Sequence, residues 1–344
     1  MASALTISPP ISCASFKARP DLPLAVGPAI KMILLFFLSG IGMFHTVATL
    51  ICNPNDPQFD NELAGKLSCH LDHEDFGSPT RRVLSSRSAE EYLFHLDRQY
   101  IEKLHNELRT FLKNKPVDIH VQPIAGRRKR LLIADMDSTI IEQECIDELA
   151  EYAGKRAEIS DITERAMRGE LDFEAALKER VAMLKGLPES VLQETFDKRI
   201  TLTPGAKTLV QTMNKLGAVT ALVSGGFTFF TSRVAAACGF QIDQSNELII
   251  ENGVLTGEVK MPILGRQAKE DALRRIASEN GIDLNETIAV GDGANDLSML
   301  EAAGLGVAFF AKPAVAEMAD ARIDHSDLTA LLFFQGIAQS EFAD

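Results

Sequence analysis

Two carboxylates placed two residues apart give this 344-residue chain its first candidate chemistry. Asp135 and Asp137 follow the apolar run Leu131–Ala134, and two hydroxyl side chains come directly after them. A short apolar run closed by polar residues is typical of a parallel strand, and ligands bind beyond the carboxyl ends of such strands. Carboxylates this close repel each other unless a cation lies between them, and Mg²⁺ prefers oxygen ligands. The pair suggests a metal-assisted acidic site, although a solvated turn is the better explanation of the pair taken by itself.

Two further predicted strands end in residues that suit phosphate or metal binding. The residues at these ends are Ser224, Gly225, Gly226, Asp292, Asn295 and Asp296. Glycine lets backbone N–H groups approach an oxyanion closely, and a serine hydroxyl adds a donor. Lys269, in the helix predicted before the Asp292 strand, supplies a positive charge. Because strand ends in a doubly wound sheet share one crevice, we expect these residues and Asp135 to form a single site.

The elements that position these residues indicate an α/β fold. Strands predicted at 218–223, 287–290 and 305–309 alternate with helices at 204–217, 227–238 and 266–280, and Asn252-Gly253 marks a hairpin. Such alternation predicts a doubly wound parallel sheet with helices on both faces. Residues 141–185 form a helical tract that delays the return to the sheet, so we expect a helical cap inserted after the first strand at about 142–200.

The region before this sheet has a different pattern, which predicts a small α+β module. Strands are predicted at 45–51 and 117–121, and apolar residues at helical spacing predict one helix within 89–112. His70 and His73 have the i, i+3 spacing of a metal pair, but a solvated surface explains them better without a third ligand. The basic segment 127–130 is either a docking patch or a charged junction.

Composition limits the classes of partner and compartment. The net charge of −13 argues against nucleic acid or an anionic membrane surface as a partner, so an anionic substrate needs a locally positive pocket. The five cysteines form no CxxC pair, which argues against a zinc site and a disulfide framework. We therefore expect a cytoplasmic protein with a small-molecule substrate and no stable membrane association.

The first 42 residues are expected to be a poorly structured extension. They are rich in serine, proline and alanine, and their apolar run at 32–38 is shorter than the roughly 20 residues of a spanning helix. A short signal peptide or anchor remains an alternative, although an acidic residue precedes the run and no clean A-x-A site follows it. The expected division is therefore an extension at 1–42, an α+β module at 43–125 and a sheet domain at 126–344.

The motifs of the sheet domain, in this order, resemble those of the haloacid dehalogenase (HAD) superfamily. Its phosphatases carry D-x-D-x-T, then Ser or Thr, then Lys, then G-D-x-x-x-D. The corresponding residues here are Asp135-Met136-Asp137-Ser138-Thr139, Ser224, Lys269 and Gly291-Asp292-Gly293-Ala294-Asn295-Asp296. The resemblance covers about 131–344 and implies a HAD-like Rossmannoid fold. It also implies a phosphatase, because members of the dehalogenase type lack the second carboxylate.

Longer segments narrow the resemblance to the phosphoserine phosphatase family. These segments are DMDSTIIEQECIDELA, RAMRGELDFEAALKERV and VSGGF. The resemblance implies that Asp135 is the nucleophile and that Asp137 is the general acid and base. It also implies a Mg²⁺ held by Asp135, the backbone carbonyl of Asp137 and Asp292, with Asp296 in support.

The same resemblance implies how the substrate is held. Ser224, Gly225 and Lys269 would bind the phosphoryl group, with Asn295 beside it. In the cap, Glu144 would bind the substrate ammonium and Arg180 its carboxylate, while Met167 and Phe173 would shield the site. Glu144 and Arg180, considered without the family, fit an exposed cap face better.

These implications predict a Mg²⁺-dependent hydrolysis of O-phospho-L-serine through an aspartyl-phosphate, the last step of serine biosynthesis. The alternative is a HAD phosphatase for another small phosphomonoester. A catalytically dead scaffold is disfavoured because no expected acidic or basic catalytic position is substituted. Long members of the family often carry ACT-like domains that bind amino acids and pair subunits. The 43–125 module is accordingly expected to serve packing or a homodimer, with amino-acid sensing as the alternative.

Overall fold

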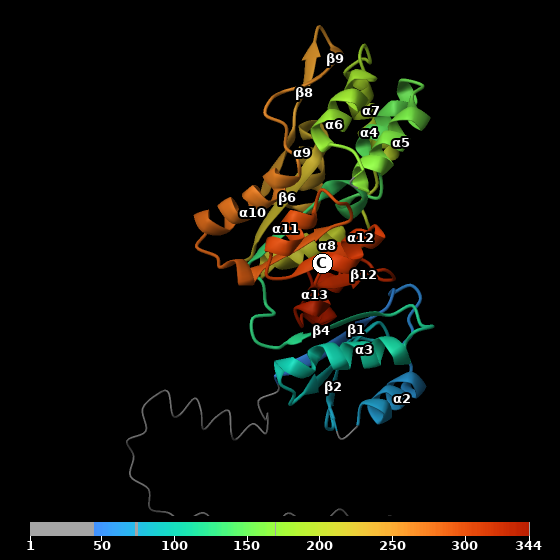
Figure 1. Cartoon of the computed structure of the whole chain (residues 1–344), viewed down its shortest axis with the longest axis vertical. Coiled ribbons are helices and arrows are strands. Elements are labelled where there is room, and N and C mark those ends of the chain that lie inside the picture. Colours follow the sequence, from blue (N-terminus) through green and yellow to red (C-terminus); the bar gives the residue numbers. More distant parts are fainter. Residues whose placement is uncertain (1–44, 73–74, 169, 344) are drawn as a thin grey trace, which may run out of the picture. The chain divides into compact units, whose positions relative to one another are not determined.

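The computed structural model describes residues 45–72, 75–168 and 170–343, with the side chain of Met167 excepted. Residues Met43–Asp344 form one compact unit, which contains a six-stranded parallel sheet, a four-stranded antiparallel sheet and a two-stranded hairpin (Figure 1). The extension predicted at 1–42 and His73 lie outside the described residues. The Met167 side chain, predicted to shield the site, also lies outside them. The domain boundaries at 42/43 and 125/126 remain predictions.

The larger sheet confirms the predicted doubly wound α/β fold. Its six parallel strands lie in the order β12-β11-β10-β5-β6-β7. The strands are β5 (Leu131–Ala134), β6 (Val219–Phe227), β7 (Ile242–Asn246), β10 (Thr287–Gly291), β11 (Gly306–Phe309) and β12 (Ala321–Ile323). The helices that follow them in the chain are α8 (Ala206–Lys215), α9 (Thr228–Cys238), α10 (Arg266–Glu279), α11 (Leu297–Ala302), α12 (Pro313–Met318) and α13 (Ala330–Phe334).

The strand β5 shows why this sheet is buried on both faces. Its side chains alternate, so that Leu131 and Ile133 pack in the core formed with α10, α11 and α12. Leu132 and Ala134 pack in the opposite core, formed with α8, α9 and α13. All four positions are therefore apolar and buried, as expected for an inner parallel strand.

A helical cap is inserted between β5 and β6, and Figure 1 shows its helices gathered at one end of the larger sheet. The helices are α4 (Cys145–Tyr152), α5 (Arg156–Met167), α6 (Phe173–Ala182) and α7 (Ser190–Arg199). The hairpin of β8 (Leu248–Glu251) and β9 (Val254–Val259) forms at the predicted Asn252-Gly253 turn. It lies beside α6, and Gly186 N donates to Leu255 O at 2.8 Å. The hairpin thus extends the cap.

The N-terminal module is richer in structure than the sequence predicts. Its elements are β1 (Thr46–Ile51), α2 (Asn61–Leu71), β2 (Thr80–Ser85), β3 (Ala89–Phe94), α3 (Ile101–Phe111) and β4 (Asp118–Pro123). The antiparallel order β2-β3-β1-β4 is that of the βαββαβ ferredoxin-like motif. The prediction of one helix within 89–112 is wrong in its first part. Residues Ala89–Phe94 form a strand because they pair with β1 and β2 on either side.

Both faces of the module's sheet are covered. Ala48 and Leu50 of β1 pack in a core with α2 and α3, whereas Ile51 belongs to the core of the larger sheet. The buried carboxylate of Asp118 accepts hydrogen bonds from the backbone of Asp324 and Ser326. A buried carboxylate of the module thus binds the backbone of the segment that follows β12.

The basic segment 127–130 forms a junction within the chain. Arg127 pairs with the buried Glu91 at 2.6 Å, and Arg130 pairs with Glu286 at 3.1 Å. Lys129 donates to the backbone carbonyl of Asn285 at 2.7 Å. These contacts favour the charged junction over the docking patch. In the module, His70 Nε2 lies 2.9 Å from Glu107 Oε1, and the His70 ring stacks on Phe111.

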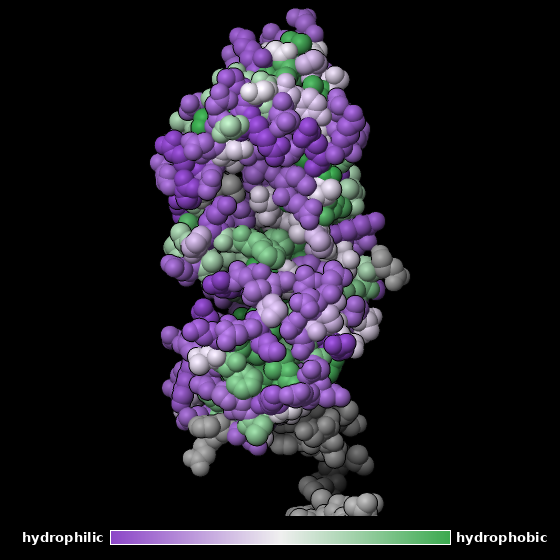
Figure 2. Space-filling view, turned by 90° about the vertical axis from the view of Figure 1, so that its right-hand side faces the viewer, coloured by the Kyte–Doolittle hydropathy of each residue, from purple (hydrophilic) through white to green (hydrophobic). Residues whose placement is uncertain are grey.

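Hydrophilic side chains cover most of the face in Figure 2, and hydrophobic ones form separate small groups on it. Among the described residues, no helix is both long and apolar enough to cross a membrane.

We predict that His120 of β4 makes folding depend on pH. Its ring is buried beside Phe334, and burial lowers the pKa of His120 to about 4. The unfolded chain therefore binds a proton between about pH 6.5 and 4 that the folded chain does not, so the free energy of unfolding falls as the pH falls through this window. In urea titrations across this range, His120→Leu should remove about 3 kcal/mol of this dependence. The exposed His45→Leu should keep it, and an unchanged profile for His120→Leu would contradict the assignment.

Candidate active site

The first two carboxylates are positioned by a tight turn at the end of β5. Asp135 closes the strand, and its Oδ1 accepts a hydrogen bond from Met136 N at 2.8 Å. Ser138 has a φ of 53°, in the left-handed region, which turns the chain sharply. Its hydroxyl donates to Glu144 Oε1 at 2.6 Å, so the same turn also orients a carboxylate at the start of the cap.

Three carboxylates meet beyond the carboxyl ends of β5 and β10. One oxygen from each of Asp135, Asp292 and Asp296 lies within 4.8 Å of the others, and all three residues are buried. Lys269 of α10 pairs with two of them, with Nζ 2.7 Å from Asp135 Oδ1 and 2.6 Å from Asp296 Oδ1. The structure thus brings together the ends of two strands, Ala134 and Gly291, that lie 157 residues apart in the sequence.

The charges in this cluster do not balance. Burial, followed by the charge of Asp296, raises the pKa of Asp135. Burial, followed by the charge of Glu144, raises the pKa of Asp292. Burial by itself lowers the pKa of Lys269, but the neighbouring carboxylates of Asp135 and Asp296 raise it, and the net effect is a raised pKa. A single ammonium therefore faces three buried acids, which leaves the cluster short of positive charge.

This donor set fits a hard divalent cation such as Mg²⁺, because it is made of closely spaced carboxylate oxygens. The Asp137 carboxylate lies outside the group and is held elsewhere: Cys145 N donates to Oδ1 at 2.9 Å, and Ser224 Oγ to Oδ2 at 3.2 Å. The predicted metal contact of Asp137 was through its backbone carbonyl, and it remains a prediction. Asp296, predicted in a supporting place, belongs to the carboxylate group itself.

The end of β6 supplies a closely packed set of donors. The strand runs on to Phe227, so that Ser224-Gly225-Gly226 belongs to its irregular end and does not follow it as predicted. Gly226 N donates to Ser224 Oγ at 2.8 Å. A Cβ on Gly226 would lie 2.7 Å from Asp137 Oδ2, so only glycine allows the carboxylate this close.

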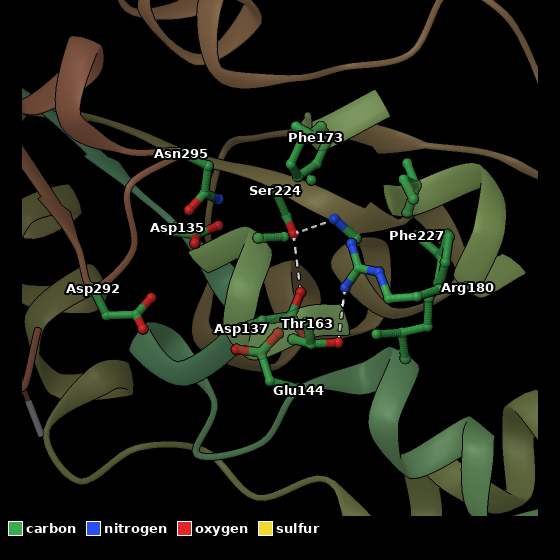
Figure 3. Close-up of a pocket in the computed structure, with 15 residues that line it drawn as sticks. Asp135, Asp137, Glu144, Thr163, Phe173, Arg180, Ser224, Phe227, Asp292 and Asn295 are labelled. Carbon is green, nitrogen blue, oxygen red and sulfur yellow. Dashed lines mark hydrogen bonds between the residues drawn. The ribbon is translucent and has the colours of Figure 1, made fainter. Parts of the chain in front are cut away.

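The cap closes the other side of the pocket (Figure 3). In that view Asp135, Asp292 and Asn295 lie on the left, and Arg180 lies on the right. The ring of Phe173 lies against the Ser224 strand, and a Cβ added to Gly225 would be 2.7 Å from its Cζ. The pocket therefore has an acidic end at the sheet and a guanidinium at the cap.

Most of the predicted site residues line this one pocket. They are Asp135, Asp137, Glu144, Phe173, Arg180, Ser224, Gly225, Asp292 and Asn295. Lys269 stands behind them and reaches the pocket through its contact with Asp135. Arg180 is only 6% exposed, so the exposed-face alternative for this residue is wrong.

Several lining residues have no signal in the sequence. The lining residues that sequence reasoning missed are Ile146, Thr163, Ala166, Leu177 and Phe227, whereas Gly226 was expected there. Asn246 was missed as well, although it donates to Gly225 O at 2.8 Å and accepts from Leu264 N at 2.7 Å. Only its position at the end of β7, beside β6, could have indicated that it supports the glycine segment.

Comparison with known proteins places this site in a family. The model of haloacid dehalogenase-like hydrolases matches residues 132–301. A phosphoserine phosphatase of Archaeoglobus fulgidus is 45% identical over 243 residues, which cover 70% of each chain. This chain belongs to the phosphoserine phosphatase family of haloacid dehalogenase-like hydrolases. Its aligned segments span 55% to 70% of the length of three curated relatives.

Solved structures of phosphoserine phosphatases agree with this membership. A phospho-aspartyl intermediate analogue of phosphoserine phosphatase is 42% identical, with a TM-score of 0.58, and covers 60% of this chain and 99% of its own. A probable phosphoserine phosphatase from Vibrio cholerae, in unliganded form, is 33% identical with a TM-score of 0.68. It covers 86% of this chain and 88% of its own, so the similarity extends beyond the sheet domain. The predicted resemblance and fold class are confirmed.

We predict that Gly291→Ala weakens divalent-cation binding. A Cβ at this last residue of β10 would overlap the Asp296 side chain and push it from the carboxylate group. Mg²⁺ affinity, measured by titration calorimetry, should fall about 10- to 100-fold. Gly65→Ala is the matched control, because a Cβ there has no atom within 4 Å. Equal affinities in the two variants would argue against a cation held by this group.

Proposed function

We propose that this protein hydrolyses O-phospho-L-serine to L-serine and phosphate, with Mg²⁺ and an aspartyl-phosphate intermediate. The two-ended pocket is the observation that carries the proposal. Its sheet end holds Asp135 and Asp292, and its cap end holds Glu144 and Arg180. Phosphoserine carries a phosphate, an ammonium and a carboxylate. Arg180 would complement the carboxylate and Glu144 the ammonium, while Lys269 and a Mg²⁺ held by the sheet-end carboxylates would complement the phosphate.

Asp135 is the proposed nucleophile. Its Oδ1 is held by Met136 N and by Lys269 Nζ, which leaves Oδ2 as the oxygen that attacks phosphorus. The new bond joins this oxygen to phosphorus as the bond between phosphorus and the serine oxygen breaks. A phosphoserine phosphatase that is 42% identical to this chain has been solved as a phospho-aspartyl intermediate analogue, which supports the same intermediate here.

Asp137 is the proposed general acid and base. Burial raises the pKa of Asp137, which favours the protonated form needed to protonate the departing serine oxygen. Cys145 N and Ser224 Oγ hold this carboxyl group in place. In the second half of the reaction, Asp137 takes a proton from the water that attacks phosphorus, and Asp135 and phosphate are released.

Positive charge is needed because a carboxylate attacks a dianion. Asp135 and Asp292, with Asp296 beside them, would hold Mg²⁺, which when bound neutralises charge on the phosphoryl oxygens. Lys269 contributes from behind Asp135, and Ser224, Gly225 and Asn295 border the phosphoryl end of the pocket. These residues orient the phosphate and cancel part of its charge.

The cap end would recognise the amino acid. Arg180 suits the carboxylate, since a planar guanidinium can bind both oxygens. Glu144 suits the ammonium, and Ser138 holds its Oε1 at 2.6 Å. Phosphomonoesters without a carboxylate would leave the buried guanidinium unpaired, which favours phosphoserine over the alternative substrates.

We further propose a cytoplasmic enzyme in the last step of serine biosynthesis. For the N-terminal module we propose packing against the catalytic part and pairing with a second copy, with amino-acid sensing as the competing role. Asp118 supports the packing role through its hydrogen bonds to the backbone of Asp324 and Ser326.

A substrate panel tests the proposed reaction. Phosphate release from O-phospho-L-serine should exceed release from phosphoethanolamine by about tenfold or more in kcat/KM, because only the first substrate pairs with Arg180. Removal of divalent cations with EDTA should stop release from both substrates, and added Mg²⁺ should restore it. Equal rates on the two substrates would favour another phosphomonoester, and full activity in EDTA would remove the metal from the mechanism.

The nucleophile is tested by Asp135→Asn. The amide cannot form the acyl phosphate, so phosphate release should fall on the order of 1,000-fold or more. Asp243→Asn, an exposed position on β7, is the control and should keep the activity. Substantial turnover by Asp135→Asn would assign the nucleophile to another residue.

A further inference from the structure

The Arg180 guanidinium is held from behind by a chain of hydrogen bonds through the cap. Arg180 Nη1 donates to Thr163 Oγ1 at 2.9 Å, the contact drawn as a dashed line in Figure 3. Arg180 Nε donates to Ala176 O of its own helix at 3.1 Å. Within the described part of the chain, Nη2 has no hydrogen-bond partner, so the other edge of the group is left for a ligand.

Thr163 is itself fixed by two neighbouring groups. Its Oγ1 lies 2.9 Å from Asp147 Oδ1 and 2.9 Å from the carbonyl oxygen of Ile159. The single hydroxyl proton goes to one of these acceptors, and in either case an oxygen lone pair remains for Arg180. Asp147 is fixed in turn, because Ser160 Oγ donates to its Oδ2 at 2.7 Å. The chain links α4, α5 and α6.

The position of Thr163 suits this role. Its side chain is 3% exposed and lines the pocket, but it is neither acidic nor basic and offers no charge to a substrate. A buried arginine can turn about its long side chain unless its N–H groups have fixed acceptors, and bidentate binding of a carboxylate requires one orientation. The Thr163 hydroxyl provides one such acceptor, for Nη1 of the guanidinium.

We propose that Thr163 is a positioning residue for substrate specificity: it sets the Arg180 guanidinium to receive the substrate carboxylate, with Asp147 fixing the hydroxyl. This inference rests on the proposed phosphoserine phosphatase function and adds to it a residue outside the motifs. It makes discrimination between substrates with and without a carboxylate depend on a hydroxyl group of the cap.

Thr163→Val tests the proposal, because valine keeps the shape of threonine and removes only the hydroxyl group. We expect kcat/KM for O-phospho-L-serine to fall about tenfold, mainly through KM. For phosphoethanolamine, which has no carboxylate, kcat/KM should stay within about twofold. Thr163→Ser retains the hydroxyl and should restore most of the preference for phosphoserine.

Thr195→Val is the matched control. Thr195 is also a buried threonine of the cap, and among the described residues its hydroxyl has no hydrogen-bond partner. This variant should keep the wild-type preference. In an Arg180→Ala background, adding Thr163→Val should cause no further loss of preference, because the guanidinium that it positions is gone.

The outcomes separate the two proposals. If the wild type does not prefer phosphoserine over phosphoethanolamine, the proposed function and this inference both fall. If the wild type shows the preference and Thr163→Val keeps it, or loses the same factor on both substrates, only the positioning role is overturned. An additive loss in the double variant would overturn the positioning role as well.

Discussion

The structure depends on the burial of three carboxylates beside one ammonium. Asp135, Asp292 and Asp296 are each at most 4% exposed, and the ion pairs of Lys269 with Asp135 and Asp296 offset part of their repulsion. Groups buried in this way favour their neutral forms unless positive charge is supplied. A divalent cation fits this deficit, and the fold maintains the deficit by holding the acids at the ends of rigid strands.

The strands fix the acids through register and close packing. In the parallel pairing of β5 with β10, Ala134 lies opposite Val290, so Asp135 and the segment after Gly291 emerge at the same edge of the sheet. Asp135 N donates to Val290 O at 3.0 Å, which continues the pairing to the nucleophile itself. The position of Asp135 therefore follows from the sheet. Arg180 and Glu144, in contrast, are positioned by side-chain hydrogen bonds, Arg180 to Thr163 of the cap and Glu144 to Ser138 of the turn after β5.

The difference between positioning by strand register and positioning by side-chain hydrogen bonds explains which site residues the sequence could predict. Motifs at strand ends are local in sequence, and parallel strands bring their ends together, so Asp135, Ser224 and Asp292 were placed in one site correctly. The strand Ala89–Phe94 was missed because its tertiary surroundings override its helical spacing: Glu90 and Glu91 are buried there by pairing with Arg81 and Arg82. Thr163 was missed because nothing in its own helix shows that an arginine 17 residues later donates to it.

The sheet and the cap form different ends of the pocket, and they meet at Gly225. The sheet contributes the reacting carboxylates, and the cap contributes the groups that match an amino acid, so chemistry and specificity have separate supports. Phe173 of the cap closes on Gly225, where any Cβ would hold the ring away from the Ser224 strand. The lack of a side chain at Gly225 thus sets how closely the cap can approach the phosphoryl end. Arg180 lies on the same helix as Phe173, so that approach also sets how near the backbone of Arg180 comes to the sheet.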